Sequence, residues 1–391
     1  MNAKSLSGRV PELDGIRGIA ILLVILWHYG VCLLNEESPS WFIVFFLKTL
    51  FSFTWSGVDL FFVLSGFLIG GILIDHKEAS NYFKVFYIRR ICRIFPLYYF
   101  WIFLFISIIV ATSSEPSNLL FRGPLPVIYY TTFTQNFLMA NAQQNGAVWV
   151  GMTWSICIEE QFYLILPFLI RFVPLNRLPH LLITLIISVP LIRVLGYPED
   201  PYSVYLLLHC RADTLLLGVL CAYLIRKEHL KNYLTTHKNH LYSFLFIFFI
   251  LILVVSIPYN LTKSDILRSS LYFLGALFYT CFLVIALVDK QGILHRVLTH
   301  RFLQFFGILA YGMYLFHQVI SALAHDLLLN QSPTLQTPLD IVVTGLAFGI
   351  TTFLAYLSWN FFEKPIVLFG QSFNYQTKEE IESSKTFIEK N

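Results

Sequence analysis

Long runs of apolar residues, separated by short polar segments, occupy most of the chain. A helix that crosses a bilayer needs about 20 mostly apolar residues, and no stretch alternates apolar and polar positions as a soluble domain does. The pattern predicts an all-α integral membrane protein, a polytopic bundle of about ten transmembrane helices. The predicted spans are 16–34, 52–74, 95–112, 155–173, 181–196, 205–225, 241–257, 270–288, 302–323 and 338–360.

Composition supports the membrane assignment. Of the 391 residues, 57% are apolar and only 13% are charged, whereas a soluble protein carries about a quarter charged residues. Aromatic residues make up 17% of the chain, which is ordinary for helices that face lipid. The six cysteines form no C-x-x-C pair and lie in or beside apolar runs. They predict neither a disulfide framework nor a metal site, and we expect no bound metal or cofactor.

The distribution of Lys and Arg predicts the orientation in the membrane. If the N-terminus is cytoplasmic, most of the 27 Lys and Arg residues fall in loops on the cytoplasmic side, as the positive-inside rule requires. We therefore expect an even number of spans and two cytoplasmic termini. The basic residues form no continuous stripe, so nucleic acid is not an expected partner.

Two parts of the chain are expected from this pattern. A transmembrane domain covers residues 9–368, and a polar, solvated cytoplasmic tail covers residues 369–391. The long connection from 113 to 154 is expected to be an ordered outer loop that packs on the bundle. The first apolar run lacks a small-residue cleavage site and contains Arg17 and His28, so it is interpreted as a retained helix.

Arg17 and His28 are eleven residues apart and share nearly one face of the first helix. Their separation along the helix axis is roughly 16 Å, which places Arg17 near the inner interface and His28 about mid-membrane. A functional interpretation is an arginine that binds an anion and an imidazole that does chemistry. The alternative is an arginine that extends to the interface and a packed histidine.

Arg89, Arg90 and Arg93 lie at the inner end of the third predicted span. On a helix Arg93 shares a face with Arg90 and also with Arg89. Such a cluster favours phosphate groups, but charge that only sets the topology is the alternative.

Further polar residues fall in the outer half of the predicted spans: Asp59, Glu159, Glu160, His209, Arg211, Asp213 and His317. Charged groups in a bilayer are costly. We therefore expect a polar cavity that opens outward, above a cationic pocket that opens inward. Structural pairing is the simpler interpretation for Asp59, Arg211 and Asp213, with Arg211 bound to Asp213 or to a glutamate. One of Glu159 and Glu160 is expected to face the cavity.

Six motifs occur in order along the chain and resemble the acyltransferase-3 family of membrane acyltransferases, which includes bacterial O-antigen and other polysaccharide O-acetylases. They are Pro11-Glu-Leu-Asp-Gly-Ile-Arg17 leading to His28, Gly57-Val-Asp-Leu-Phe-Phe-Val-Leu-Ser-Gly-Phe67, Arg90-Ile-Cys-Arg93, Trp154-Ser155 with Glu159-Glu160-Gln-Phe-Tyr163, Tyr311-Gly-Met-Tyr-Leu-Phe-His317, and Glu363-Lys-Pro365. The resemblance covers roughly residues 9 to 368.

The sequence departs from the family in two respects. Some members carry an additional C-terminal esterase-like domain, and this chain ends too soon for one. The family often has Glu-Arg-Pro where this chain has Glu363-Lys364-Pro365. Lysine keeps the charge but lacks the planar fork of arginine, so a bidentate contact is not expected there.

The resemblance implies an acyltransferase for groups other than aminoacyl groups, in the bacterial inner membrane. It implies acyl-CoA, most often acetyl-CoA, as the co-substrate, and a hydroxyl of a carbohydrate or lipid-linked sugar as the acceptor. We expect Arg17, Arg90 and Arg93 to bind the CoA phosphates. Neutral His28 is the expected general base, with Glu159 or Glu160 to orient it or to bind the acceptor. Asp59, Ser155 and His317 are expected to bind the acceptor or to be structural.

A transporter or proton-coupled carrier is the main alternative, because carriers also place ionisable residues at mid-membrane. Carriers often show related halves, and no repeat is visible in this sequence. A membrane scaffold without activity is the third hypothesis, and in it neither His28 nor the arginines matter.

Overall fold

The computed structural model describes residues 10–34, 51–112 and 126–376. Ten helical segments in this part of the chain are long and apolar enough to cross a membrane, which confirms the predicted fold class. They contain the helices α1 (Pro11–Tyr29), α3 (Gly57–Asp75), α4 (Tyr82–Thr112), α8 (Trp154–Phe172), α9 (Leu178–Gly196), α11 (Leu208–Ile225), α13 (Lys238–Thr262), α14 (Asp265–Val288), α16 (Arg301–Leu329) and α17 (Pro338–Ser358).

Short elements connect or extend these helices. They are η1 (Val31–Leu33), η2 (Ser52–Ser56), α5 (Val127–Thr131), α6 (Gln135–Ala142), α7 (Val148–Gly151), α10 (Pro201–Leu206), α12 (Glu228–Thr236), α15 (Ile293–Leu298), the π-helix η3 (Trp359–Glu363) and α18 (Lys364–Gln371).

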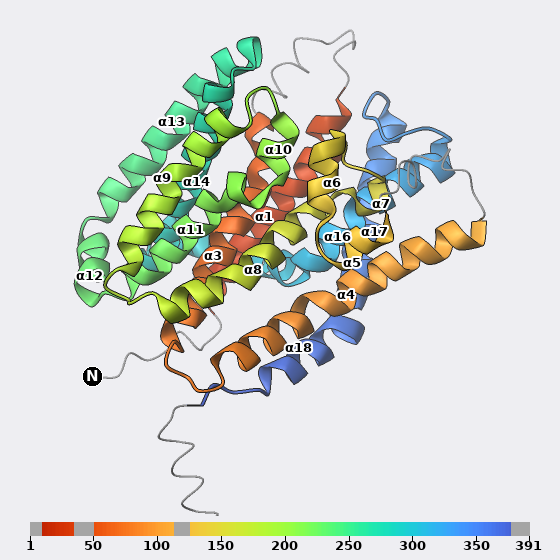
Figure 1. Cartoon of the computed structure of the whole chain (residues 1–391). Helices are drawn as coiled ribbons and strands as arrows, with labels where there is room; N and C mark the ends of the chain where they lie inside the picture. The colour runs from red at the N-terminus through yellow and green to blue at the C-terminus, as the bar shows by residue number, and fades with distance from the viewer. Residues whose placement is uncertain (1–9, 35–50, 113–125, 377–391) are drawn as a thin grey trace, which may run out of the picture.

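Helices α1 and α3 occupy the centre of the bundle (Figure 1). Helix α1 packs along α16, and α3 packs along α11. Helices α9, α13 and α14 lie on one side of this centre, and α4 with α18 lies on the other. The two central helices are therefore surrounded by protein, which suits helices that carry polar side chains.

Glycine lets α1 and α16 approach until their backbones touch. A Cβ atom at Gly307 would lie 1.9 Å from the carbonyl oxygen of Asp14, and one at Gly18 would lie 2.0 Å from that of Leu303. Small residues at such crossings are typical of membrane helices, because close packing drives their association. This crossing sets the position of α16 beside Arg17 and His28.

Two predicted boundaries on the site helices are wrong. Helix α1 begins at Pro11 and ends at Tyr29, so His28 lies in its last turn. Helix α4 begins at Tyr82, well before the predicted residue 95. The arginines are therefore inside this helix, which continues through them and through Pro96.

The described part of the predicted outer loop is ordered. Residues 126–153 form α5, α6 and α7, which pack on α4, α8, α10 and α16. Residues 113–125 lie outside the described part of the chain. In Figure 1 these short helices lie between α4 and α10.

The predicted solvated tail is partly wrong. Residues 369–371 end α18, and the segment that follows packs on the bundle. Arg89 Nη2 donates to the carbonyl of Phe373 at 2.6 Å, and Asn81 Nδ2 donates to that of Asn374 at 2.9 Å. Residues 377–391 lie outside the described part.

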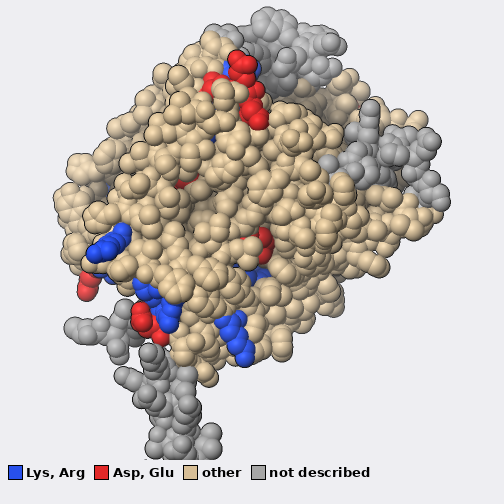
Figure 2. All heavy atoms as spheres, in the orientation of Figure 1, with Lys and Arg blue, Asp and Glu red and all other residues tan. Residues whose placement is uncertain are grey.

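Charge is distributed unevenly over the face of the molecule in Figure 2. Most of the visible Lys and Arg side chains lie toward the end at which α1 begins, here called the N-terminal end, and the middle of the face is almost uncharged. The opposite end is called the distal end. An uncharged middle is the surface that a bilayer requires.

Candidate active site

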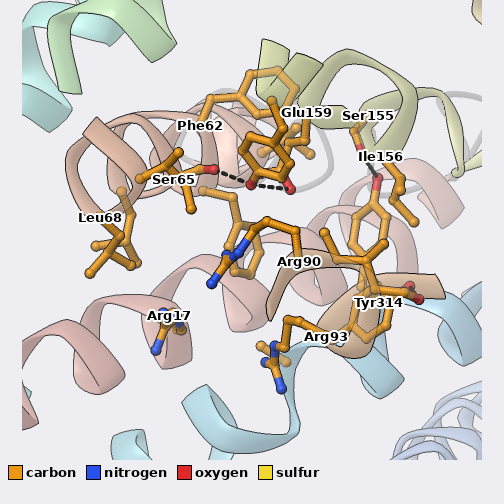
Figure 3. A pocket seen from close by; sticks show the side chains of 18 residues that line it. Arg17, Phe62, Ser65, Leu68, Arg90, Arg93, Ser155, Ile156, Glu159 and Tyr314 are labelled. Atoms are coloured by element: carbon orange, nitrogen blue, oxygen red, sulfur yellow. Dashed lines mark hydrogen bonds between the residues drawn. The ribbon is translucent and has the colours of Figure 1, made fainter. Parts of the chain in front are cut away.

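Three arginines from two helices line one cavity of about 150 Å³ (Figure 3). Arg17 comes from α1, and Arg90 and Arg93 lie one turn apart on α4. Arg17 Nη1 forms an ion pair with Asp14 at 2.9 Å, and the Arg93 guanidinium lies 5.2 Å from the ring centre of Trp359. The structure therefore brings together the three arginines that the sequence singled out, and this cavity is called the cationic cavity.

Arg89 does not belong to the cationic cavity. Its Nε and Nη2 atoms donate to the carbonyl of Phe373 at 3.0 and 2.6 Å. Arg89 and Arg90 thus have different surroundings, because consecutive residues on a helix point about 100° apart.

A chain of hydrogen bonds crosses the wall of the cationic cavity opposite the arginines (Figure 3). Ser65 Oγ and Tyr163 Oη are 2.5 Å apart, and Tyr163 Oη donates to Glu159 Oε2 at 3.2 Å. Glu159 also interacts electrostatically with Arg90. Of the two adjacent glutamates, Glu159 is therefore the one that faces a cavity. Glu160 is buried, lines neither cavity, and its Oε1 atom has no hydrogen-bond partner in the described residues.

His28 lines a second, larger cavity of about 700 Å³. Trp27, Trp55, Trp154 and Tyr272 also line this cavity, which is called the aromatic cavity. The high aromatic content was interpreted as lipid-facing surface. That interpretation is wrong for these residues, which come from helices whose order in space the sequence does not show.

The hydrogen-bond network assigns the protons of two histidines. His28 Nδ1 is 2.9 Å from the carbonyl of Val24, and His317 Nδ1 is 2.7 Å from that of Tyr314. A carbonyl only accepts, so both Nδ1 atoms carry the proton. His317 Nε2 lies 3.3 Å from His28 Nδ1 and can accept from it.

This assignment leaves Nε2 of neutral His28 unprotonated. In the described part of the chain this atom has no hydrogen-bond partner, and His28 lines the aromatic cavity. The geometry therefore offers a basic nitrogen to a molecule in that cavity. No hydrogen bond joins Glu159 or Glu160 to His28 among the described residues, so His317 takes the orienting place expected for a glutamate.

Val58 and Tyr314 line both cavities, so the two cavities are neighbours and these residues mark their junction. Tyr314 Oη is 2.7 Å from Ser155 Oγ and donates to the carbonyl of Met152 at 2.9 Å. Ser155 thus holds the tyrosine at the junction. The sequence shows that Tyr314 and His317 are three residues apart and share a helix face. It does not show that Ser155 of α8, which is distant in the sequence, contacts Tyr314.

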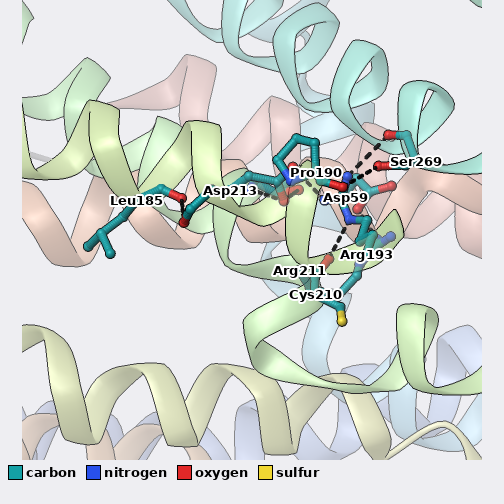
Figure 4. Close-up of polar contacts among 10 residues, drawn as sticks. Asp59, Leu185, Pro190, Arg193, Cys210, Arg211, Asp213 and Ser269 are labelled. Atoms are coloured by element: carbon teal, nitrogen blue, oxygen red, sulfur yellow. Dashed lines mark hydrogen bonds and ion pairs between the residues drawn. The ribbon is translucent and has the colours of Figure 1, made fainter. Parts of the chain in front are cut away.

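Asp59 is part of a buried ion-pair network and lines neither cavity (Figure 4). Its carboxylate pairs with Arg211, while Asp213 pairs with Arg193. The expected contact of Arg211 with Asp213 or a glutamate is therefore wrong. Arg193 also donates to the carbonyl of Cys210 at 2.7 Å and so ties α9 to α11. The role of Arg193 was not predicted, because its partners Cys210 and Asp213 lie on another helix.

Comparison with known proteins identifies the family. The family model described as "Acyltransferase domain" (Acyl_transf_3) matches residues 10–360. The peptidoglycan O-acetyltransferase OatA of Listeria monocytogenes is 27% identical over 372 residues, which cover 91% of this chain and 56% of that protein. The O-acetyltransferase OatA of Staphylococcus aureus strain MRSA252 is 26% identical over 397 residues, which cover 97% of this chain and 61% of that protein.

This chain thus spans about six tenths of the length of these relatives, and no solved structure matches it. The acyltransferase interpretation is confirmed over the carrier and scaffold alternatives, because the matched region includes both cavities. The chain belongs to the acyltransferase-3 family and is an integral membrane acyltransferase.

Proposed function

We propose that this enzyme transfers an acyl group, most simply acetyl, from acyl-CoA to a hydroxyl of a carbohydrate acceptor. The observation that supports it most is the junction of the two cavities at Tyr314. One cavity presents three guanidinium groups, which suit the phosphates of CoA. The other presents His28, which suits deprotonation of a hydroxyl.

The donor is proposed to enter from the N-terminal end, which the distribution of Lys and Arg predicts to be cytoplasmic. Arg17, Arg90 and Arg93 would bind its phosphates. The cationic cavity of about 150 Å³ is smaller than a typical ligand pocket, for which about 300–1,000 Å³ is usual. Only part of the donor fits, so its arm would extend past Tyr314 toward His28. A protein in the inner membrane is consistent with the bacterial relatives.

The proposed reaction is a direct transfer. His28 Nε2 takes the proton of the acceptor hydroxyl while the hydroxyl oxygen attacks the thioester carbonyl. The carbon–sulfur bond breaks, CoA leaves as a thiolate, and the proton passes from His28 to the sulfur. In this proposal the Val24 carbonyl and His317 Nε2 both accept from Nδ1 of His28, so this nitrogen keeps its proton and Nε2 is the atom that takes up and releases the acceptor's proton.

Peptidoglycan is the substrate named for the Listeria relative, and a polymer of this class is a candidate acceptor for this chain. Because the chain spans only part of that protein, we propose a carbohydrate acceptor in general and do not name one polymer. Family membership supports an acceptor that is acylated on a hydroxyl oxygen. The aromatic cavity at His28 supports an acceptor that contains a sugar ring.

The donor half of this proposal is tested by acetyl-CoA binding to the purified protein in nanodiscs. Arg93→Ala should weaken binding about 10- to 100-fold, since a charge-assisted hydrogen bond is worth about 1.5–3 kcal/mol. Arg89→Ala is the matched control. It removes the same charge from the same helix, but the Arg89 side chain binds the carbonyl of Phe373 and does not line the cavity. Equal losses in the two variants, or no binding by the wild type, would contradict CoA as the donor.

A further inference from the structure

The aromatic cavity contains one permanently charged residue among its described lining, Arg268, and no acidic one. Arg268 lies in the first turn of α14 and is 8% exposed. A guanidinium buried in an aromatic wall is costly unless its donors are satisfied. The contacts of Arg268 therefore indicate what the cavity binds.

The protein satisfies this guanidinium only in part. Nη2 donates to the carbonyl of Lys263 at 3.3 Å, a long contact. Nη1 is 3.0 Å from Asp265 Oδ1, but the contact lacks hydrogen-bond geometry, and Nε has no partner among the described residues. Asp265 instead accepts the backbone N–H of Glu199 through its other oxygen at 2.8 Å. Two donors of this buried arginine thus lack a hydrogen-bond partner among the described residues, and the arginine lines the cavity.

The rest of the wall suits a sugar ring. Trp27, Trp55 and Trp154 are three of the seven tryptophans of the chain, and all line this cavity. Trp55 packs on Tyr272 with ring centres 5.2 Å apart. Flat aromatic faces stack on the C–H faces of pyranose rings, while a few polar groups set orientation and specificity. The cavity of about 700 Å³ lies within the range of small-molecule sites.

We propose that the aromatic cavity selects carbohydrate acceptors that carry an oxyanion, either a carboxylate or a phosphate, and that Arg268 binds this group. The inference rests on the proposed function and adds the acceptor class to it. Arginine forms its strongest hydrogen bonds with these anions, and no acidic side chain of the described lining repels them. His28 lines the same cavity, so an acceptor bound at Arg268 shares the compartment of the base.

The test compares three soluble acceptors that share one ring: methyl glucoside, methyl glucuronide and glucose 6-phosphate. Binding is followed by quenching of tryptophan fluorescence without any donor, and transfer from acetyl-CoA is followed as kcat/KM. The wild type should prefer at least one anionic sugar over the neutral one by about tenfold or more, as a charge-assisted hydrogen bond implies. The carboxylate and phosphate arms show which anion the site takes.

Arg268→Gln should abolish this preference and leave the neutral sugar unaffected, while Arg268→Lys should keep part of it. Lys263→Gln is the matched control, because it removes a charge from an exposed neighbour that does not line the cavity. Asp265→Asn should strengthen the preference, because it removes the negative charge 3.0 Å from Nη1 that competes with the anion of the acceptor. Acetyl-CoA binding should be the same in all variants.

Equal binding of the neutral and the anionic sugars by the wild type would overturn the inference and leave the proposed function standing. A preference that survives in Arg268→Gln would also overturn it. Sugar binding in the absence of any transfer from acetyl-CoA would contradict the proposed donor instead. The fluorescence measurement therefore separates failure of the acceptor site from failure of the proposed reaction.

Discussion

Nε2 of His317 lies 3.3 Å from Nδ1 of His28, although 289 positions separate the two residues in the sequence. The contact joins α16 to the last turn of α1. The carbonyl of Val24, 2.9 Å from Nδ1 of His28, assigns the proton to that nitrogen, and His317 Nε2 is a second acceptor for it because His317 Nδ1 donates to the carbonyl of Tyr314 at 2.7 Å. His317 is thus a positioning residue in this account, and His28 is the base.

Replacing His317 by Ala should lower kcat by roughly three- to tenfold and leave KM for the donor unchanged. The reason is the loss of one orienting hydrogen bond, worth about 0.5–1.5 kcal/mol. The pH–rate profile should also shift, which a loss of packing alone would not cause. His317→Gln, whose amide can accept the same hydrogen bond, should recover part of the rate. An unchanged profile in His317→Ala would contradict the positioning role.

Asp59 should matter for stability and not for acceptor binding. Asp59→Asn leaves Arg211 buried with an uncompensated charge, and breaking a buried pair costs about 3–5 kcal/mol. Asp75→Asn is the control, because the Asp75 and Arg226 pair is partly exposed and such pairs contribute about 0–1 kcal/mol. Thermal unfolding in detergent measures both. Similar melting temperatures for the two variants would contradict a structural role for Asp59.

The close crossing of α1 and α16 can be tested at Gly307. Ala at this position would place Cβ 1.9 Å from a backbone oxygen of Asp14, so the helices must separate. Overpacking costs about 1–3 kcal/mol or more, and we expect a lower melting temperature and lower activity. Gly345→Ala, where a Cβ meets nothing within 4 Å, should be neutral or slightly stabilising. A neutral Gly307→Ala would show that the crossing is looser than described.

One pH effect on stability is expected in the loop after α14. The hydrogen bond from Lys238 holds the pKa of Asp289 below its usual value, with further help from Tyr242 and backbone N–H groups. A carboxylate with a lowered pKa stabilises the fold above its ordinary pKa of about 3.9 and loses this contribution as the pH falls further. In Asp289→Asn the melting temperature should fall less steeply with decreasing pH below about pH 4 than it does in the wild type. An identical acid profile would contradict this contact.

Much of the fold was predictable, because a membrane span is recorded in the local apolar pattern. The spans were found, and the errors lie at boundaries where charged residues continue a helix, as Arg89, Arg90 and Arg93 do in α4. The three cavity arginines were also predictable from their motifs and helical spacing. Those features need only the order of residues along one helix.

The partners of the site residues were not predictable, since they depend on which helices cross. His317 beside His28, Asp59 with Arg211, and Arg268 in the aromatic cavity each join distant segments. The Trp and Tyr residues that line that cavity could not be distinguished from residues that face lipid. Their side chains have the same composition in both places, and only the packing separates them.

The division between donor binding and chemistry is tested most directly by measuring acetyl-CoA binding and acetyl transfer separately in His28→Ala. We predict that binding stays within about threefold of the wild type, because the arginines of the cationic cavity are intact. Transfer should fall about 10²- to 10⁴-fold, the usual contribution of a general base. Full transfer in His28→Ala, or loss of binding in parallel with transfer, would contradict the account.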